Sequence, residues 1–340
     1  MKKTLLIADL HLTTHPLDYY KWNIFEKLME EITLQGIKIV NILGDLTEKK
    51  DNHSALLVNK LCSYLEVLLS SGVEQIRILK GNHDFVNEEI PFFEFLNVSP
   101  QIQFITTPTR IDNEFFYPYT TEYDLPKYAD EINKCEYLYM HTQLKGIKLD
   151  NGKVLEEGLT KEDFSCIKVK DIFSGHLHYF SGHLENRPVR YLGSPYPVYF
   201  GDGSNYGSIV ILPTNFHWNY VEAIARYNES FKTLENFEEW LEIATIAKDQ
   251  LKVTFELDRT DYDKWPDMKK EVKELCKNRK LELISLTLKP TKSTVLLSDN
   301  ATNEPILLES YIETAQRFAG KEKLSPEYLT IAEGIINANT

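Results

Sequence analysis

The sequence of 340 residues contains no long hydrophobic run. No apolar segment approaches the roughly 18 residues that a membrane-spanning helix needs, so we expect no membrane association. The first residues, Met1-Lys2-Lys3, lead directly into an apolar segment and its aspartate, which is not the pattern of a secretion signal. The four cysteines are scattered without pair spacing, at Cys62, Cys135, Cys166 and Cys276. We therefore expect reduced, mostly buried thiols in a cytoplasmic protein.

Positive charge is also scarce, because 38 Lys and Arg residues stand against 51 Asp and Glu residues, giving a net charge of −13. This balance disfavours a DNA-binding enzyme, since non-specific affinity for a duplex comes mainly from Lys and Arg neutralising phosphates. Two divalent ions at an active site would reverse the local potential, and a basic partner subunit could supply further affinity. Acidic charge elsewhere can simply keep a protein in solution.

Five short polar segments each follow an apolar run with the character of a β-strand. The polar segments are Asp9-Leu10-His11, Gly44-Asp45, Gly81-Asn82-His83-Asp84, His141 and Gly175-His176-Leu177-His178. The apolar runs are Leu5 to Ala8, Ile37 to Leu43, Ile76 to Leu79, Tyr137 to Met140 and Ile172 to Phe173. Because ligands gather beyond the carboxyl ends of strands in α/β domains, we expect these Asp, His and Asn side chains at one edge of a sheet.

These residue types suit a site for two divalent metal ions. Two ions roughly 3.5–4 Å apart can hold the attacking and leaving oxygens of a phosphoryl displacement, and a carboxylate must lie between them. Asp45 is the expected bridge. The expected ligand sets are Asp9, His11, Asp45 and His178 for one ion and Asp45, Asn82, His141 and His176 for the other. Mixed imidazole and carboxylate ligation suits manganese, iron or zinc better than magnesium.

His83 remains beside the expected metals without a ligand role. We interpret it as the general acid that protonates the leaving oxygen, with Asp84 orienting its ring. An ordinary structural role is a reasonable alternative for any one motif, because a lone Asp-x-His or Gly-Asp is common. A purely structural role does not readily explain why all five motifs occur in this order, each directly after an expected strand.

With these motifs the chain resembles the calcineurin-like metallophosphoesterases and, within them, SbcD-type nuclease subunits of double-strand-break repair. Tyr191-Leu192-Gly193-Ser194-Pro195 is similar to a Gly-Ser-Pro element of those nucleases. The stretch from His141 through Leu144-Lys145-Gly146 to Gly207 looks closest to the recombination endonuclease subunits of T-even-like phages. The resemblance implies an α/β fold of two stacked sheets flanked by helices, a small α+β capping domain and a C-terminal helical tail. It also implies a bacterial cell or phage-infected host.

One position departs from the resembled nucleases. They commonly carry a phosphate-positioning histidine three residues after the bridging aspartate, whereas this chain has Glu48 there. His53, in the following loop, could take that role or could be an ordinary solvated histidine.

Four regions are expected: a metallophosphoesterase nuclease domain at 1–212, a DNA-capping domain at 213–289, a linker at 290–303 and a helical partner-binding tail at 304–340. The resemblance is specific over residues 1–212. After residue 212 only the order of helices and strands is similar. A helix of the second region carries Lys269, Lys270, Lys273 and Lys277. This basic face could contact DNA or simply be solvated.

The tail carries apolar residues at helical spacing. They include Leu307, Leu308, Tyr311 and Ile312 in a first helix and Ile335 in a second. Two short amphipathic helices cannot bury these faces alone, so they must dock on something. The resemblance implies an SbcC-type coiled-coil ATPase subunit as the partner, and docking on the chain's own catalytic domain is the alternative.

These observations predict a manganese-dependent DNA nuclease subunit, with exonuclease and endonuclease activity at DNA ends, that works with an SbcC-type ATPase in repair, recombination and replication. The alternative is a phosphatase or phosphodiesterase that acts on a small molecule, which leaves the second domain and the tail without a role. A homodimer is also expected, because resembled nucleases pair through helices where this chain has Leu56 to Leu69 and the apolar cluster Phe92, Phe93, Phe95 and Leu96. Ordinary core packing is the other interpretation of those two segments.

Overall fold

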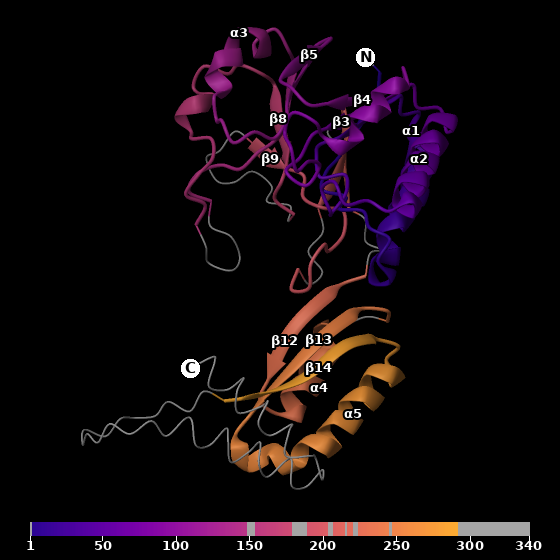
Figure 1. Ribbon diagram of the computed structural model, residues 1–340, viewed down its shortest axis with the longest axis vertical. Coiled ribbons are helices and arrows are strands. Elements are labelled where there is room, and N and C mark those ends of the chain that lie inside the picture. The colour runs from indigo at the N-terminus through magenta and orange to yellow at the C-terminus, as the bar shows by residue number, and fades with distance from the viewer. Residues whose placement is uncertain are drawn as a thin grey trace, which may run out of the picture. The chain divides into compact units, whose positions relative to one another are not determined.

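The computed structural model describes residues 2–147, 154–178, 189–202, 207–214, 216–219, 224–244 and 247–291 (Figure 1). The chain divides into two compact units, Met1–Thr291 and Lys292–Thr340. The predicted tail, and the predicted linker from residue 292 onward, therefore lie outside the described residues. Among the helices that are described, none is long and apolar enough to cross a membrane.

The first layer is a six-stranded sheet with the order β11-β10-β1-β2-β3-β4. Its strands are β1 (Thr4–Ile7), β2 (Ile39–Ile42), β3 (Gln75–Leu79), β4 (Ile102–Ile105), β10 (Ser208–Leu212) and β11 (Phe216–Asn219). Strands β1 to β4 are parallel neighbours, with Thr4 opposite Ile39 and Ile7 opposite Ile42, whereas β10 and β11 are antiparallel. This sheet extends past residue 212, where we expected the catalytic domain to end. The domain boundaries stay predictions.

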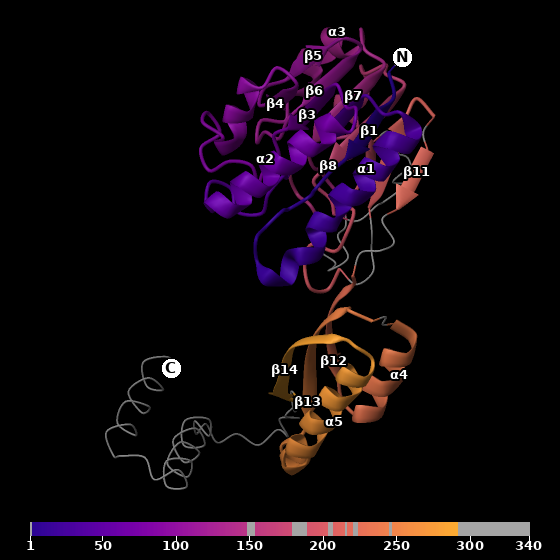
Figure 2. The same ribbon diagram turned by 90° about the vertical axis from the view of Figure 1, so that its right-hand side faces the viewer.

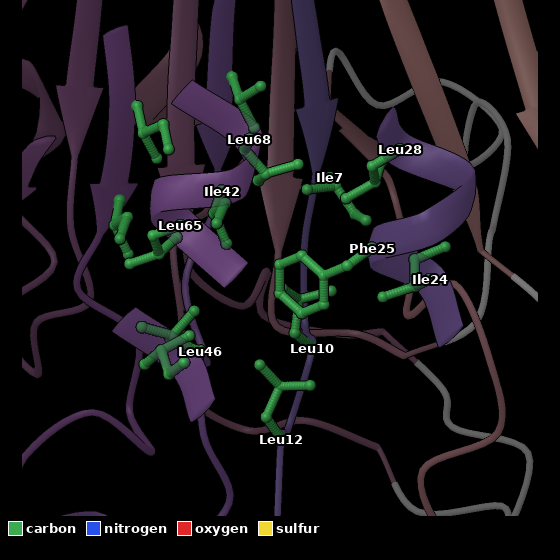
Figure 3. Close-up of a cluster of buried hydrophobic side chains, with 14 of the residues drawn as sticks. Ile7, Leu10, Leu12, Ile24, Phe25, Leu28, Ile42, Leu46, Leu65 and Leu68 are labelled. Atoms are coloured by element: carbon green, nitrogen blue, oxygen red, sulfur yellow. The ribbon is translucent and has the colours of Figure 1, made fainter. Parts of the chain in front are cut away.

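Two amphipathic helices cover one face of this sheet (Figure 2). Helix α1 (Ile24–Gln35) ends at Gly36, whose φ of 66° allows its N–H to bond back to the carbonyl of Ile32. Ser54 caps the start of helix α2 (Ala55–Ser70), because its hydroxyl accepts a hydrogen bond from the N–H of Leu57. Buried side chains at helical spacing on both helices pack onto the sheet (Figure 3). Their buried residues recur mainly three or four positions apart, as expected of amphipathic helices.

The second layer is a five-stranded sheet with the order β5-β6-β7-β8-β9. Its strands are β5 (Thr109–Ile111), β6 (Glu114–Tyr117), β7 (Tyr137–His141), β8 (Asp171–Gly175) and β9 (Val189–Tyr191). One buried cluster joins the inner faces of the two sheets, including Leu6 and Leu79 of the first and Tyr139 and Phe173 of the second. The predicted fold of two stacked sheets flanked by helices is confirmed. The remaining short helices are η1 (Pro16–Asn23), η2 (Phe92–Val98), η3 (Leu125–Tyr128), α3 (Ala129–Ile132) and η4 (Glu162–Phe164).

A third, three-stranded parallel sheet follows with the order β12-β13-β14. Its elements are β12 (Arg226–Phe231), α4 (Leu234–Ala244), β13 (Gln250–Leu257), η5 (Arg259–Lys264), α5 (Trp265–Asn278) and β14 (Glu282–Pro290). It has its own apolar cluster, which includes Phe237, Phe255 and Val272. Helices and strands thus alternate through this region after β12, in an α+β arrangement.

A buried arginine ties this third sheet to the N-terminal segment. Arg226 donates to the carbonyl oxygens of Leu17 and Val198 at 2.8 Å each, and it pairs with Asp18 at 2.6 Å. Lys21, 3.7 Å from Asp18, donates to the carbonyl oxygen of His11 at 3.0 Å. Removing one partner of a buried ion pair typically costs about 3–5 kcal/mol. The network therefore holds the backbone of His11 and the start of β12 in one polar cluster.

Candidate metal centre

The predicted metal ligands lie at the carboxyl ends of five strands, β1, β2, β3, β7 and β8. One potential ligand atom from each of Asp9, His11, Asp45 and His178 lies within 4.8 Å of the others, and the same is true of Asp45, His141 and His176. Asn82 Oδ1 is 3.1 Å from His141 Nε2 and 2.8 Å from His176 Nδ1. The structure thus brings all seven residues together. Asp45 belongs to both groups, which is the position that a bridging carboxylate needs.

Four of these residues have a backbone conformation that non-glycine residues rarely adopt. Their φ angles are 53° at Asp9, 41° at His11, 51° at Asp45 and 89° at His176. Each such residue costs on the order of 1–3 kcal/mol and persists only where the surrounding structure enforces it. Such strain clusters at functional sites, and here it coincides with the sharp turns that follow the strands.

Two glycines in the motifs allow these segments to approach one another. A Cβ on Gly44 would overlap the ring of His141, and its φ of 87° already disfavours any side chain. A Cβ on Gly81 would overlap the backbone N and carboxylate of Asp45. These glycines are therefore needed for close packing around the carboxylate of Asp45.

The hydrogen bonds around the centre leave atoms free for metal ions. Asp9 Oδ1 accepts from the N–H of His176 at 2.8 Å, whereas Asp9 Oδ2 and His11 Nε2 are buried without a hydrogen-bond partner among the described residues. His141 Nδ1 bonds the carbonyl oxygen of Leu43 at 2.7 Å, so Nε2 faces Asp45 Oδ2 at 3.4 Å. Unpaired polar atoms are costly to bury, and cations between them would remove that cost. The donor set fits two divalent ions.

The buried carboxylates and histidines of the centre shift one another's pKa values. Burial alone would lower the pKa of His11 and of His141, but the carboxylate of Asp45, together with Glu48 at His11 and Asp9 at His141, outweighs it and raises each pKa to about 9. Burial would raise the pKa of Asp45, and the two histidines hold it well below its usual range. Burial raises the pKa of Asp9 to about 6. Because metal ligands must be deprotonated, cation binding here has to release protons.

Glu48 has a role that sequence reasoning missed. Its Oε2 lies 2.7 Å from His11 Nδ1, and its Oε1 accepts from the hydroxyl of Tyr199 at 3.2 Å. A carboxylate on Nδ1 fixes the tautomer of a metal-ligating histidine and directs Nε2 to the metal. From the sequence, Glu48 was noted only because the resembled nucleases commonly have a histidine at this position. His53, considered as an alternative there, packs against Phe92 with ring centroids 4.5 Å apart and is half-buried rather than solvated.

We expect Glu48→Ala to weaken binding of divalent metal by about 10- to 100-fold, the usual cost of losing a residue that orients a metal ligand. Glu48→Gln keeps an acceptor for His11 Nδ1 and should lose less. Calorimetric titration with Mn²⁺ measures both, and Glu26→Ala, at an exposed position of α1, is the matched control. Unchanged affinity in Glu48→Ala would contradict the role.

His83 lies beside the centre, but Asp84 does not act as expected. The N–H of His83 donates to Asp45 Oδ1 at 2.8 Å, and His83 Nδ1 lies 2.9 Å from the carbonyl oxygen of Glu48. The carboxylate of Asp84 instead accepts from the backbone N–H groups of Gly81 and Leu46, at 2.8 and 2.9 Å. Asp84 therefore holds the turns after β2 and β3 together, and the backbone at Glu48 orients the His83 ring.

The remaining predicted residues are not part of this cluster. The four lysines are exposed on α5, at Lys269, Lys270, Lys273 and Lys277, and their contact with DNA stays a prediction. The predicted partner-binding residues of the tail lie outside the described residues. Sequence reasoning also missed Tyr199, whose ring centroid is 5.3 Å from that of His178, and Tyr119, 5.7 Å from His176.

Two solved structures similar to this chain are a nuclease and a phosphatase. The Pseudomonas putida nuclease MPE is 13% identical, with 52% of this chain and 62% of that chain covered and a TM-score of 0.28. A cold-active protein-tyrosine phosphatase from a psychrophilic Shewanella is 15% identical, with 65% of this chain and 78% of that chain covered and a TM-score of 0.33. This chain thus covers less than two thirds of the nuclease, and neither likeness bears on the substrate.

The family model described as calcineurin-like phosphoesterase matches residues 2–286, which is most of the chain. Members of this family are metal-dependent hydrolases of phosphoesters with two divalent ions, and the groups around Asp45 are a candidate for that site. This chain belongs to the calcineurin-like phosphoesterase family.

Proposed function

We propose that this protein is a manganese-dependent DNA nuclease subunit of the SbcD type. In this proposal it hydrolyses phosphodiester bonds at DNA ends during double-strand-break repair and recombination, in the cytoplasm of a bacterial cell or a phage-infected host. The observation that carries the proposal is the pair of ligand groups that share Asp45, with His83 held beside them. The sheet of β12, β13 and β14 adds support, because a small-molecule phosphatase has no evident need for it.

In this proposal, different residues of the centre have different roles in hydrolysis. Two bound cations would supply Lewis-acid stabilisation of the phosphoryl oxygens and activation of the attacking water. Asp45 accepts the N–H of His83 and so fixes the turn that carries the proposed general acid. Since His83 Nδ1 is held by the carbonyl oxygen of Glu48, Nε2 is the ring nitrogen left for proton transfer to the leaving oxygen. Mixed imidazole and carboxylate ligands favour manganese over magnesium.

The test compares two substrates under two metal conditions. Linear duplex DNA and bis(p-nitrophenyl) phosphate are each incubated with Mn²⁺ and, separately, with excess EDTA. We expect manganese-dependent cleavage of both, with DNA the better substrate by kcat/KM. Hydrolysis of the small ester alone would instead favour the small-molecule phosphodiesterase, an alternative that the net charge of −13 supports.

We also propose a homodimer formed by α2 and η2. Leu61, Leu65 and Phe93 are buried, but Val67 of α2 is 39% exposed and Val98 of η2 is 90% exposed. The segments are thus part core and part exposed apolar surface. Burying such surface is worth roughly 25 cal/mol per Å².

The dimer makes a direct prediction for Val98→Asp. We expect light scattering at micromolar concentration to give a dimeric mass for the parent and a monomeric mass for this variant, because a buried unpaired charge disfavours association. Ile243→Asp, at an 87% exposed position on α4, is the control and should remain dimeric. A monomeric parent would count decisively against the dimer.

The SbcC-type ATPase is the proposed partner of the tail. A chain that ends at Thr291, where the first compact unit ends, should fold and retain manganese-dependent cleavage of short substrates. It should lose capture of the ATPase and ATP-dependent processing of duplex ends. Leu308→Asp with Ile312→Asp tests the same idea without shortening the chain. Unfolding or aggregation of the truncated chain would show that the tail completes this protein's own core.

A further inference from the structure

An open cavity of about 710 Å³ lies next to the metal centre. Its wall is formed by the segment after β1, the loop between β2 and α2, and three residues from later in the chain, Phe200, Arg226 and Lys252. It is large enough for a group the size of a nucleotide, since ligand sites typically occupy about 300–1,000 Å³.

The cavity and the metal centre share parts of their walls. Glu48 lines the cavity, and its carboxylate lies 2.7 Å from His11 Nδ1. Leu12, also in the wall, directly follows His11, and Phe200 directly follows Tyr199, whose ring is 5.3 Å from that of His178. The cavity therefore adjoins the side of the candidate metal centre that carries His11 and Glu48.

The cavity has uncompensated positive charge. Its two carboxylates already have partners, because Asp18 forms an ion pair with Arg226 at 2.6 Å and Glu48 is hydrogen-bonded to His11 Nδ1 at 2.7 Å. Lys49 and Lys252 also line it, and neither forms an ion pair with a carboxylate of the described residues. In a protein with a net charge of −13, two such lysines beside a phosphoesterase centre indicate an anionic occupant.

Aromatic and hydroxyl side chains in the wall of the cavity contact or accompany its cationic groups. The Nζ of Lys252 lies 4.1 Å from the ring centroid of Phe200, and the guanidinium of Arg226 lies 4.9 Å from the same centroid. The hydroxyls of Thr14 and Ser54, 3.5 Å apart, add hydrogen-bond donors to the wall. Ammonium and hydroxyl donors together suit the oxygens of a phosphodiester.

We propose that this cavity binds a backbone phosphate that flanks the scissile phosphodiester of a single-stranded segment of DNA, with Lys49 and Lys252 as its cationic contacts. The proposal rests on the nuclease function and deepens it. A small phosphodiester has no second phosphate to place there, so the cavity makes the centre selective for polynucleotides. Lys49 and Lys252 are binding residues for the flanking strand and take no part in the chemical step.

The test uses the double variant Lys49→Ala with Lys252→Ala, made in the full-length chain. Lys161→Ala with Lys168→Ala, at exposed positions of another region, removes the same charge and is the control. With Mn²⁺, we measure kcat/KM for a single-stranded oligonucleotide and for bis(p-nitrophenyl) phosphate. Binding of a fluorescent oligonucleotide is followed by anisotropy over a range of salt concentrations, with Ca²⁺ in place of Mn²⁺.

We expect the cavity variant to lose about tenfold or more in kcat/KM for the oligonucleotide, as for the loss of charge-assisted hydrogen bonds, with the small ester unchanged. The slope of log affinity against log salt should fall by about 0.7 for each phosphate contact removed. The control variant should match the parent in all assays.

Equal losses on both substrates would overturn the proposal, since the lysines would then support the metal centre itself. Oligonucleotide cleavage and binding at the level of the control would also overturn it. If the parent hydrolyses only the small ester, the nuclease function fails. The cavity proposal then stands only if the parent still binds the oligonucleotide and the variant does not, and it falls if the parent does not bind.

Discussion

Asp45→Ala should abolish hydrolysis and prevent the paired binding of two divalent ions. Asp45 is the residue common to both ligand groups, and its Oδ2 lies 3.4 Å from both His11 Nε2 and His141 Nε2. Its loss leaves both histidines without the carboxylate that offsets their charge, and it also removes the acceptor of the His83 N–H. We expect the rate to fall by more than the roughly 10- to 100-fold typical of losing a residue that only orients a ligand.

Calorimetric titration with Mn²⁺ and hydrolysis of bis(p-nitrophenyl) phosphate measure this effect, and circular dichroism checks that the variant folds. Asp130→Ala, at an exposed position of α3, is the matched control and should behave as the parent. Two manganese ions bound to Asp45→Ala as tightly as to the parent would refute the bridging role.

His83→Ala should act differently, because a proton donor can be removed without dismantling the ligand groups. His83 Nδ1 is held by the carbonyl oxygen of Glu48, and its ring centroid is 4.8 Å from that of His11. We expect DNA cleavage to slow by about 100- to 10,000-fold, the usual contribution of general acid catalysis, with metal occupancy retained.

The leaving group provides the control for His83. The p-nitrophenolate ion leaves readily without a proton, so His83→Ala should slow hydrolysis of bis(p-nitrophenyl) phosphate much less than cleavage of DNA. Equal slowing of both reactions would indicate a role in binding or positioning the phosphate. Near-normal DNA cleavage would exclude any essential role for the residue.

The sequence by itself predicted the elements that depend on neighbouring residues. The spacing of Phe25, Leu28 and Ile32 and the glycine after them specify α1, because an amphipathic helix and its left-handed cap need only local information. The same holds for the predicted metal ligands. Each follows a strand within a few residues, and the carboxyl ends of parallel strands meet at one edge, so the short motifs were enough to bring the ligands together.

Only the tertiary structure decided which side chains support that centre. Glu48 reaches His11 across 37 positions of the chain, and Arg226 reaches Asp18 across 208. Asp84 bonds the backbone of Leu46 rather than the ring of the adjacent His83. These contacts depend on how the turns after different strands pack against each other and on where the third sheet attaches. Local propensity and periodicity carry no information on such distances, because they describe a residue's relation to its own segment and not to another.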